Sequence, residues 1–292
     1  MLTSVKHCPD IDCAGRLLDL STPAIMGVIN TTPDSFSDGG LLYKGGRLDV
    51  DRALYKASSM VADGARILDI GGESTRPGAA PVSYLQECDR VLPLLEKICA
   101  ELDVIVSVDT STASIMTAAA ELGAGMLNDV RALSREGALQ AAAESNLPIC
   151  LMHMRGSPLD MQQSPHYANV VQAVRLFLQQ RVAACVEAGI EKNCIILDPG
   201  FGFGKTVKHN LQLLQGLPHL SELGFPLLVG FSRKSMIEKL IGRSVDKRLP
   251  ASLALAVLAV ERGAGIIRTH DVAATVDAVA MAVALANEEH YE

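Results

Sequence analysis

The chain alternates between short apolar runs and longer segments in which apolar residues recur with helical spacing. The longer segments include 84–100, 170–188 and 272–287, where the period is about 3.6 residues. The apolar runs are too short for helices and are expected as buried strands, at 24–30, 65–70, 104–109, 125–128, 148–153, 194–198, 226–230 and 265–268. Buried strands separated by helices are typical of parallel βαβ units. Because eight such units close into a cylinder, the pattern predicts an α/β fold of the (β/α)8 TIM-barrel type.

The main alternative is an open, doubly wound parallel sheet with helices on both faces. No turn between a predicted strand and its helix carries a full G-x-G-x-x-G motif, so a dinucleotide-binding sheet is the weaker interpretation. The length of 292 residues also suits one barrel, which typically takes about 250 residues. No internal segment resembles a linker. We therefore expect a lead-in over 1–22 and a single barrel domain over 23–292.

The composition supports a packed α/β core and narrows the class of partner. Hydrophobic residues make up 49% of the chain and aromatic residues only 4%, so the core must consist mainly of Ala, Val, Ile and Leu. The net charge of −7 argues against a nucleic-acid partner, which needs a basic surface. A small anionic substrate needs only a few local cations and stays possible.

Membrane and export segments are not expected. The longest apolar run, 253–260, is far shorter than the ~20 residues that span a bilayer. The opening residues, MLTSVKHCPD, lack the apolar segment of a signal peptide. The seven cysteines are scattered and form no C-x-x-C pair, as is usual for reduced thiols. These features predict a cytoplasmic protein without a membrane partner.

Polar side chains stand at the ends of most predicted strands. They are Asn30, Asp109, Asn128, His153, Asp198, Ser232 and Arg268. In a parallel barrel all of these ends lie at one rim, where the active sites of this fold are built. Helix capping is the alternative for Asn, Asp and Ser, and core packing is the alternative for His153. The convergence of so many strand ends nevertheless predicts one shared pocket.

Three Gly-, Pro- and Ser-rich stretches, 31–46, 71–83 and 154–166, follow predicted strands and are expected to be binding loops or lids at the same rim. In the second, Glu73 is expected to brace its loop, with metal ligation as the alternative. Asp69 lies inside a strand and is expected to serve the barrel interior or to support the site.

The segment 198–206 superficially resembles a phosphate-binding P-loop but lacks its first glycine, because Pro199 occupies that position. We interpret it as a glycine-rich loop whose backbone closely approaches a ligand. Phe203 is expected either to cover a flat ring or simply to pack. Ser232 is expected to cap the next helix, whose N-terminus would attract anions. Arg268 and His270 follow the last strand, at a position that commonly binds phosphate in barrels.

These motifs resemble the signatures of a known family, the dihydropteroate synthases. The resemblance is carried by the segments 26–40 (MGVINTTPDSFSDGG), 69–78 (DIGGESTRPG), 107–110 (SVDT), 128–129 (ND), 198–205 (DPGFGFGK), 232–235 (SRKS) and 268–271 (RTHD). It implies a TIM barrel that condenses (7,8-dihydropterin-6-yl)methyl diphosphate with 4-aminobenzoate in folate biosynthesis. It also implies Mg²⁺ as a cofactor, competition by sulfonamides and a homodimer.

The resemblance also assigns roles to residues. It implies a pterin pocket made of Asp109, Asn128, Asp198 and Lys234. It implies a diphosphate site made of Asn30, Arg268 and His270, with Asn30 also on Mg²⁺. It implies a 4-aminobenzoate site shaped by Thr75, Arg76, Pro77, Phe203 and Ser232. The residues expected to act in the reaction itself are Lys234, Arg268, His270 and Asp109.

This chemistry needs no strong base, because an aromatic amine is already a nucleophile at pH 7. The absence of a recognisable Ser-His-Asp or Cys-His arrangement is therefore expected. The difficult step is the departure of diphosphate, which aimed cations and donors would ease. We expect this departure to run ahead of amine attack, and the pterin substrate to bind first. The rival interpretations are a methyltetrahydrofolate methyltransferase barrel, an inactive pterin-binding scaffold and a sugar-phosphate barrel enzyme.

Overall fold

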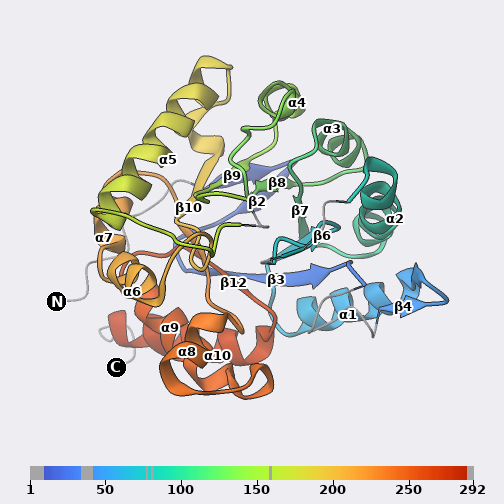
Figure 1. Ribbon diagram of the computed structural model, residues 1–292. Helices are drawn as coiled ribbons and strands as arrows, with labels where there is room; N and C mark the ends of the chain where they lie inside the picture. Colours follow the sequence, from blue (N-terminus) through green and yellow to red (C-terminus); the bar gives the residue numbers. More distant parts are fainter. Residues whose placement is uncertain (1–9, 34–41, 77, 80–81, 158–159, 288–292) are drawn as a thin grey trace.

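Eight parallel strands form the centre of the molecule, and helices surround them (Figure 1). The computed structural model describes residues 10–287 except 34–41, 77, 80–81 and 158–159. Neighbouring strands follow the order β10-β9-β8-β7-β6-β3-β12-β11. Leu197 in β10 bridges Leu227, and its N–H donates to Pro226 O at 2.9 Å, so the first and last strands of this order also meet. The predicted TIM barrel is confirmed, and the open sheet is excluded.

The strands of the barrel lie close to their predicted ranges. They are β3 (Ala24–Asn30), β6 (Ile67–Gly71), β7 (Ile105–Asp109), β8 (Met126–Asp129), β9 (Ile149–Met152), β10 (Ile195–Asp198), β11 (Leu228–Gly230) and β12 (Ile266–Thr269). The helices are α1 (Val50–Ala62), α2 (Tyr84–Glu101), α3 (Ala113–Glu121), α4 (Ala138–Ser145), α5 (Val170–Glu187), α6 (Val207–Gln215), α7 (Leu217–Ser221), α8 (Ser235–Ile241), α9 (Leu249–Val260) and α10 (Val272–Ala286). In the described part of the chain, two short 3₁₀ turns, η1 (Lys192–Cys194) and η2 (Val245–Lys247), complete the helical elements.

Strand alternation sorts the side chains into an inner and an outer set. On β6, Ile67 belongs to the core inside the barrel, while Leu68 and Ile70 pack in the layer between strands and helices. Asp69 therefore points inward, two residues beyond Ile67, and is completely buried. Other strands make the same inward step from an apolar to a polar residue, from Met126 to Asn128, from Ile196 to Asp198 and from Ile266 to Arg268. The interior thus changes from apolar at the amino end to charged at the carboxyl end.

Two small antiparallel hairpins stand outside the barrel sheet. β1 (Ile11–Cys13) pairs with β2 (Arg16–Leu18), within the predicted lead-in. Ile11 and Leu18 join the core inside the barrel, so this hairpin closes the amino end. β4 (Tyr43–Lys44) pairs with β5 (Arg47–Leu48) in the connection from β3 to α1. No helix in the described part of the chain has both the length and the apolar character needed to cross a membrane.

Candidate active site

A cavity opens at the carboxyl end of the strands, and most of the predicted site residues line it. Those lining it are Thr75, Asp109, Asn128, Asp198, Phe203, Ser232, Lys234, Arg268 and His270. Asn30 joins them through its side-chain amide, which lies 3.3 Å from Nε2 of His270. Pro77 lies outside the described residues, and Arg76 is not among the lining side chains. The prediction that the strand ends share one pocket is confirmed for all of the predicted strand-end residues except His153.

A charged group of side chains forms the floor of this cavity. Nε of Arg268 donates to the buried carboxylate of Asp69 at 2.6 Å, and one of its terminal nitrogens donates to Asp109 at 3.1 Å. The Asn128 amide donates to the same Asp69 carboxylate at 3.3 Å. Asp69 therefore supports the site from below, as predicted, by fixing Arg268 and Asn128 from neighbouring positions.

Two carboxylates share a single guanidinium in this floor. Burial and the nearby charge of Asp69 raise the pKa of Asp109 well above its usual value, against the opposing effect of Arg268. Burial alone would lower the pKa of Arg268, but Asp69 and Asp109 outweigh it and raise that pKa. The arrangement holds more negative than positive charge, so a ligand that donates hydrogen bonds to Asp109 would favour its ionised form.

A third carboxylate, Asp198, lines the same cavity as Lys234 and interacts with its charge. The Asp198 carboxylate accepts a hydrogen bond from Gly200 N at 2.7 Å, and burial raises its pKa although Lys234 opposes the shift. Nζ of Lys234 donates to Phe201 O and lies 4.9 Å from the centre of the Phe203 ring. Burial lowers the pKa of Lys234 to about 8, against the pull of Asp198. Lys234 is thus a cation whose charge is easily lost unless an anion comes near.

The imidazole of His270 is held between two neighbours. Nδ1 lies 3.0 Å from Ser232 Oγ, which also accepts from the His270 main-chain N–H at 3.2 Å. Because the Asn30 amide nitrogen can only donate, Nε2 accepts from it and the ring proton resides on Nδ1. Burial, and then the positive charges of Arg268 and others, lower the pKa of His270 well below its usual value. His270 is therefore a neutral ring here, so of the residues expected at the diphosphate site only Arg268 carries a positive charge of its own.

The turn after β11 differs from its prediction. Ser232 does not cap a helix, because α8 begins at Ser235 and Lys234 occupies the cap position without a side-chain bond. Arg233, which the sequence did not suggest, takes a left-handed φ of +59°. The Asp271 carboxylate holds its guanidinium at 2.5 and 3.2 Å. This ion pair fixes the turn, so that Ser232 and Lys234 both face the cavity.

The glycine-rich loop after β10 also has a different cause from the predicted one. A side chain at Gly200 would place Cβ 1.9 Å from His153 O, and one at Gly204 would place it 2.4 Å from Arg155 O. These glycines therefore allow close packing against another loop of the protein rather than against a ligand. Nζ of Lys205 joins the two loops, with His153 Nδ1 at 2.9 Å and Gly200 O at 2.7 Å.

His153 takes no part in the cavity. It follows the inward-facing Met152, so alternation turns its side chain outward, where its ring packs edge-on against Phe177 at 4.9 Å. The alternative interpretation, a core histidine, is correct. Val28, Val130 and Gly230 also line the cavity, although the sequence did not point to them. The inward phase of β3 and β11 could have identified Val28 and Gly230, which lie two residues before Asn30 and two after Leu228.

The described residues offer little to a metal ion on their own. Within the described ranges, no group of three or more His, Cys, Asp or Glu side chains is arranged to hold one. Glu73 is paired with Arg131 and Arg135, so it braces its loop as predicted. The amide oxygen of Asn30 remains as a hard oxygen donor. Mg²⁺ commonly takes few protein ligands and binds mainly through substrate phosphates and water. The side chains present therefore fit an ion that arrives with a phosphorylated ligand.

Comparison with known proteins agrees with this geometry. The sequence profile described as pterin binding enzyme matches residues 26–270. The dihydropteroate synthase of Haemophilus influenzae is 49% identical over 272 residues, which cover 93% of this chain and 97% of that protein. The chain belongs to the dihydropteroate synthase family.

Solved structures extend this likeness to three dimensions. The dihydropteroate synthase of Yersinia pestis, solved with a sulfonamide drug complex, superposes with a TM-score of 0.92 at 48% identity and covers 95% of this chain and 99% of its own. The enzyme of Xanthomonas albilineans with 4-aminobenzoic acid gives a TM-score of 0.89 at 47% identity, with 96% and 99% covered. The family resemblance first seen in the motifs is confirmed by both comparisons.

Proposed function

We propose that this chain is a transferase that condenses (7,8-dihydropterin-6-yl)methyl diphosphate with 4-aminobenzoate to give 7,8-dihydropteroate and diphosphate. The observation that carries the proposal is a single cavity lined by Asp109, Asp198, Lys234 and Arg268. Carboxylates that can accept from a ring edge and cations that can face an anion lie there within one pocket. Membership of the dihydropteroate synthase family supports the same reaction.

The pterin is proposed to bind over the floor of the cavity. A pterin carries an amidine edge with several N–H donors, which suits the carboxylates of Asp109 and Asp198. Asn128 can donate and accept at the same ring edge. Lys234, directed by its bond to Phe201 O, lies over the Phe203 ring and can donate to a ring nitrogen or oxygen of the pterin.

The diphosphate is proposed to bind beside His270. Charges from four cationic side chains, Arg268, Arg233, Lys56 and Arg76, act on this imidazole together. Such a field attracts an anion, and an anion placed there would in turn raise the pKa of His270. Asn30 adds an amide group on the other side of the ring.

In the proposed reaction the bond between the pterin methylene carbon and the diphosphate oxygen breaks, and the electron pair leaves with diphosphate. A positive charge then spreads from the methylene into the ring, where ionised Asp109 would stabilise it. The amine of 4-aminobenzoate forms the new C–N bond and loses a proton. Arg268 and His270 favour the first step by meeting negative charge as it develops on the leaving group.

Mg²⁺ is proposed as a cofactor, with Asn30 as its one protein ligand and the remaining positions filled by diphosphate oxygens and water. When bound, it would supply further positive charge to the leaving group. The 4-aminobenzoate site is proposed around Thr75, Phe203 and Ser232, which line the cavity, with Arg76 at its edge. Pro77 and residues 34–41 lie outside the described residues, so closure of the loops 31–46 and 71–83 stays a prediction.

A homodimer is also proposed. The outer surface of α8, α9 and α10 exposes large hydrophobic side chains, among them Leu258, Met281 and Leu285, which are 38%, 71% and 60% exposed. The helices α9 and α10 pack against each other, and exposed apolar residues on neighbouring helices are typical of an interface. A cytoplasmic location is proposed as well, since the cysteines that the structure describes are free thiols.

One assay tests the reaction. The protein is supplied with the pterin diphosphate, 4-aminobenzoate and Mg²⁺, and both diphosphate release and 7,8-dihydropteroate formation are followed. Release that requires both substrates, with equal amounts of the two products, supports the proposal. Release without 4-aminobenzoate, or methyl transfer from methyltetrahydrofolate instead, would replace it with a different reaction.

A further inference from the structure

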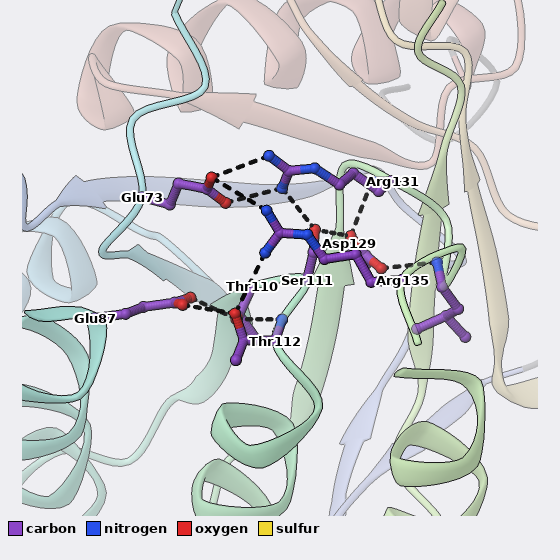
Figure 2. Close-up of polar contacts among 9 residues, drawn as sticks. Glu73, Glu87, Thr110, Ser111, Thr112, Asp129, Arg131 and Arg135 are labelled. Carbon is purple, nitrogen blue, oxygen red and sulfur yellow. Dashed lines mark hydrogen bonds and ion pairs between the residues drawn. The ribbon is translucent and has the colours of Figure 1, made fainter. Parts of the chain in front are cut away.

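A network of polar side chains joins three loops at the catalytic end of the barrel (Figure 2). This rim network consists of eight side chains, those of Glu73, Glu87, Thr110, Ser111, Thr112, Asp129, Arg131 and Arg135. These residues come from the segments that follow β6, β7 and β8 and from the first turn of α2. None of these eight described residues lines the cavity. A role in the reaction would therefore have to act through other residues.

Glu73 is the point where two loops meet. Two nitrogens of Arg131 donate to its two carboxylate oxygens at 2.8 and 3.0 Å, which is a bidentate pair. Arg135 approaches the same carboxylate at 3.6 Å (Figure 2). The side chains of Glu73 and Arg131 are only 9% and 15% exposed, whereas that of Arg135 is 41% exposed. Arg131 therefore provides the fixed geometry, and Arg135 mainly adds charge.

Asp129 anchors Arg131 to the barrel. Its buried carboxylate accepts from the main-chain N–H of Arg131 at 2.8 Å and of Leu133 at 2.7 Å, and also from Ser111 Oγ. Ser111 Oγ in turn accepts from the Arg131 guanidinium at 3.0 Å. Because Asp129 directly follows Asn128 in β8, Arg131 is tied to the strand that supplies a floor residue of the cavity.

Glu87 connects the loop after β7 to the first turn of α2. Its carboxylate, 2% exposed, accepts from the hydroxyls of Thr110 and Thr112 at 2.5 and 2.8 Å. Thr110 directly follows Asp109, the acidic residue that shares Arg268. The loop after β7 and the first turn of α2 are thus held at a fixed distance.

The rim network is better suited to fix the geometry of the three loops than to add to the stability of the fold. Burying an ion pair costs desolvation that its attraction barely repays, so apolar packing would stabilise these loops as well or better. A bidentate pair instead fixes both the distance and the angle between its partners. Glu73 precedes Thr75, which lines the cavity, by only two residues. The loop that contributes Thr75 is therefore positioned from outside the cavity.

We propose that Glu73 and Arg131 are positioning residues for the second substrate. Their ion pair holds Thr75 against the part of the cavity where 4-aminobenzoate binds. The pair is itself held in place by residues next to the strands that carry Asp109 and Asn128. The inference rests on the proposed function. It separates the two substrates, because the hydrogen bonds that fix the pterin floor come from strand residues and from Asp69, while Glu73 acts on Asp109 at a distance, through its charge.

The test compares Arg131→Lys with Arg135→Lys by steady-state kinetics in which both substrates are varied. Lysine keeps the charge but loses the planar fork. For Arg131→Lys we expect KM for 4-aminobenzoate to rise about tenfold, with KM for the pterin diphosphate changed less than about twofold. For Arg135→Lys, the matched control, we expect both KM values to stay within about twofold, since its contact is long and exposed. Glu73→Gln should raise KM for 4-aminobenzoate as Arg131→Lys does. Because the two residues act as one pair, the variant that carries both substitutions should raise this KM no further than Glu73→Gln alone.

The unaltered protein in the same assay tests the proposed function separately. If it is active and all the variants show the same KM for 4-aminobenzoate, the positioning role is overturned. It is also overturned if both lysine variants raise this KM equally, because charge rather than geometry would then decide. Thermal melting provides the folding control, and a lower melting temperature with both KM values unchanged would mean that the pair only stabilises the protein. Should Arg131→Lys not fold, Glu73→Gln carries the same comparison.

Discussion

Lys234 allows the electrostatics of the proposed site to be tested by pH. Its ammonium group faces Asp198 and Arg268 and has a pKa of about 8, against an ordinary value of 10.5. The folded-state pKa lies below the unfolded one, so between pH 8 and 10.5 the unfolded chain holds more protons and stability rises with pH. Integrating from pH 7 to pH 10 gives a gain of about 2.5 kcal/mol from this group. That figure is an upper bound, because Lys234 is partly open to solvent in the cavity.

Activity should fall as the pH rises, whereas stability should increase. A Lys234 pKa of about 8 makes the protonated fraction fall roughly tenfold between pH 7 and pH 9, and kcat/KM for the pterin diphosphate should fall with it. Urea unfolding of the wild type and of Lys234→Met at pH 7 and 10 measures the stability term, since other groups cancel in the comparison. Lys234→Arg should keep a flat rate profile to pH 9, because arginine stays charged. An equal pH dependence of stability in the wild type and Lys234→Met, or a rate loss that persists in Lys234→Arg, would refute this account.

Three further changes test other parts of the structure. Asp69→Asn removes a charge-assisted bond to Arg268, worth about 1.5–3 kcal/mol, so kcat/KM for the pterin diphosphate should fall roughly 10- to 150-fold; a KM change for 4-aminobenzoate alone would contradict this assignment. Gly200→Ala, whose Cβ would collide with a backbone oxygen at 1.9 Å, should lower the melting temperature far more than Gly189→Ala, which has a similar positive φ but open space around it. An equal drop in melting temperature for the two variants would mean that the positive φ, and not the collision with His153 O, accounts for the destabilisation. Met281→Glu should shift the protein toward monomer in sedimentation velocity, and an unchanged distribution would remove α10 from the proposed interface.

The barrel could be predicted because its strands are fully buried and bounded by helices. The range 24–30 matches β3 at both ends, and the expected strand at 104–109 differs from β7 by one residue. The hairpin of β1 and β2 has only three residues in each strand, too few for alternation to stand out. A helix was expected to open at Ser232 after the strand 226–230, but α8 begins at Ser235 and has only seven residues, too few for its pattern to fix the first turn.

The site was predicted largely for a correct reason, with one refinement. Most of the pocket residues could be found because they stand at strand ends. Whether a strand-end residue reaches the cavity depends, however, on whether alternation along the strand points its side chain into the barrel. His153 ends the run after β9 in the outward phase and belongs to the core, whereas Asp69 lies deeper in its strand in the inward phase and supports the floor. Contacts between loops far apart in sequence, such as Arg233 with Asp271, have no local pattern and required the structure.

The ionisable groups of the cavity share a property that bears on substrate order. Burial pushes Asp109 and Lys234 toward their neutral forms, and His270 is neutral as well. A hydrogen-bond donor would favour the ionised form of Asp109, and an anion would favour the charged forms of Lys234 and His270. A pterin diphosphate offers both, N–H donors at the ring and negative charge at the tail. The second substrate offers a single amine as donor and has neither the paired N–H donors of the pterin ring edge nor a diphosphate. A cavity of this kind therefore gains most from the pterin substrate, which explains physically why that substrate should bind first.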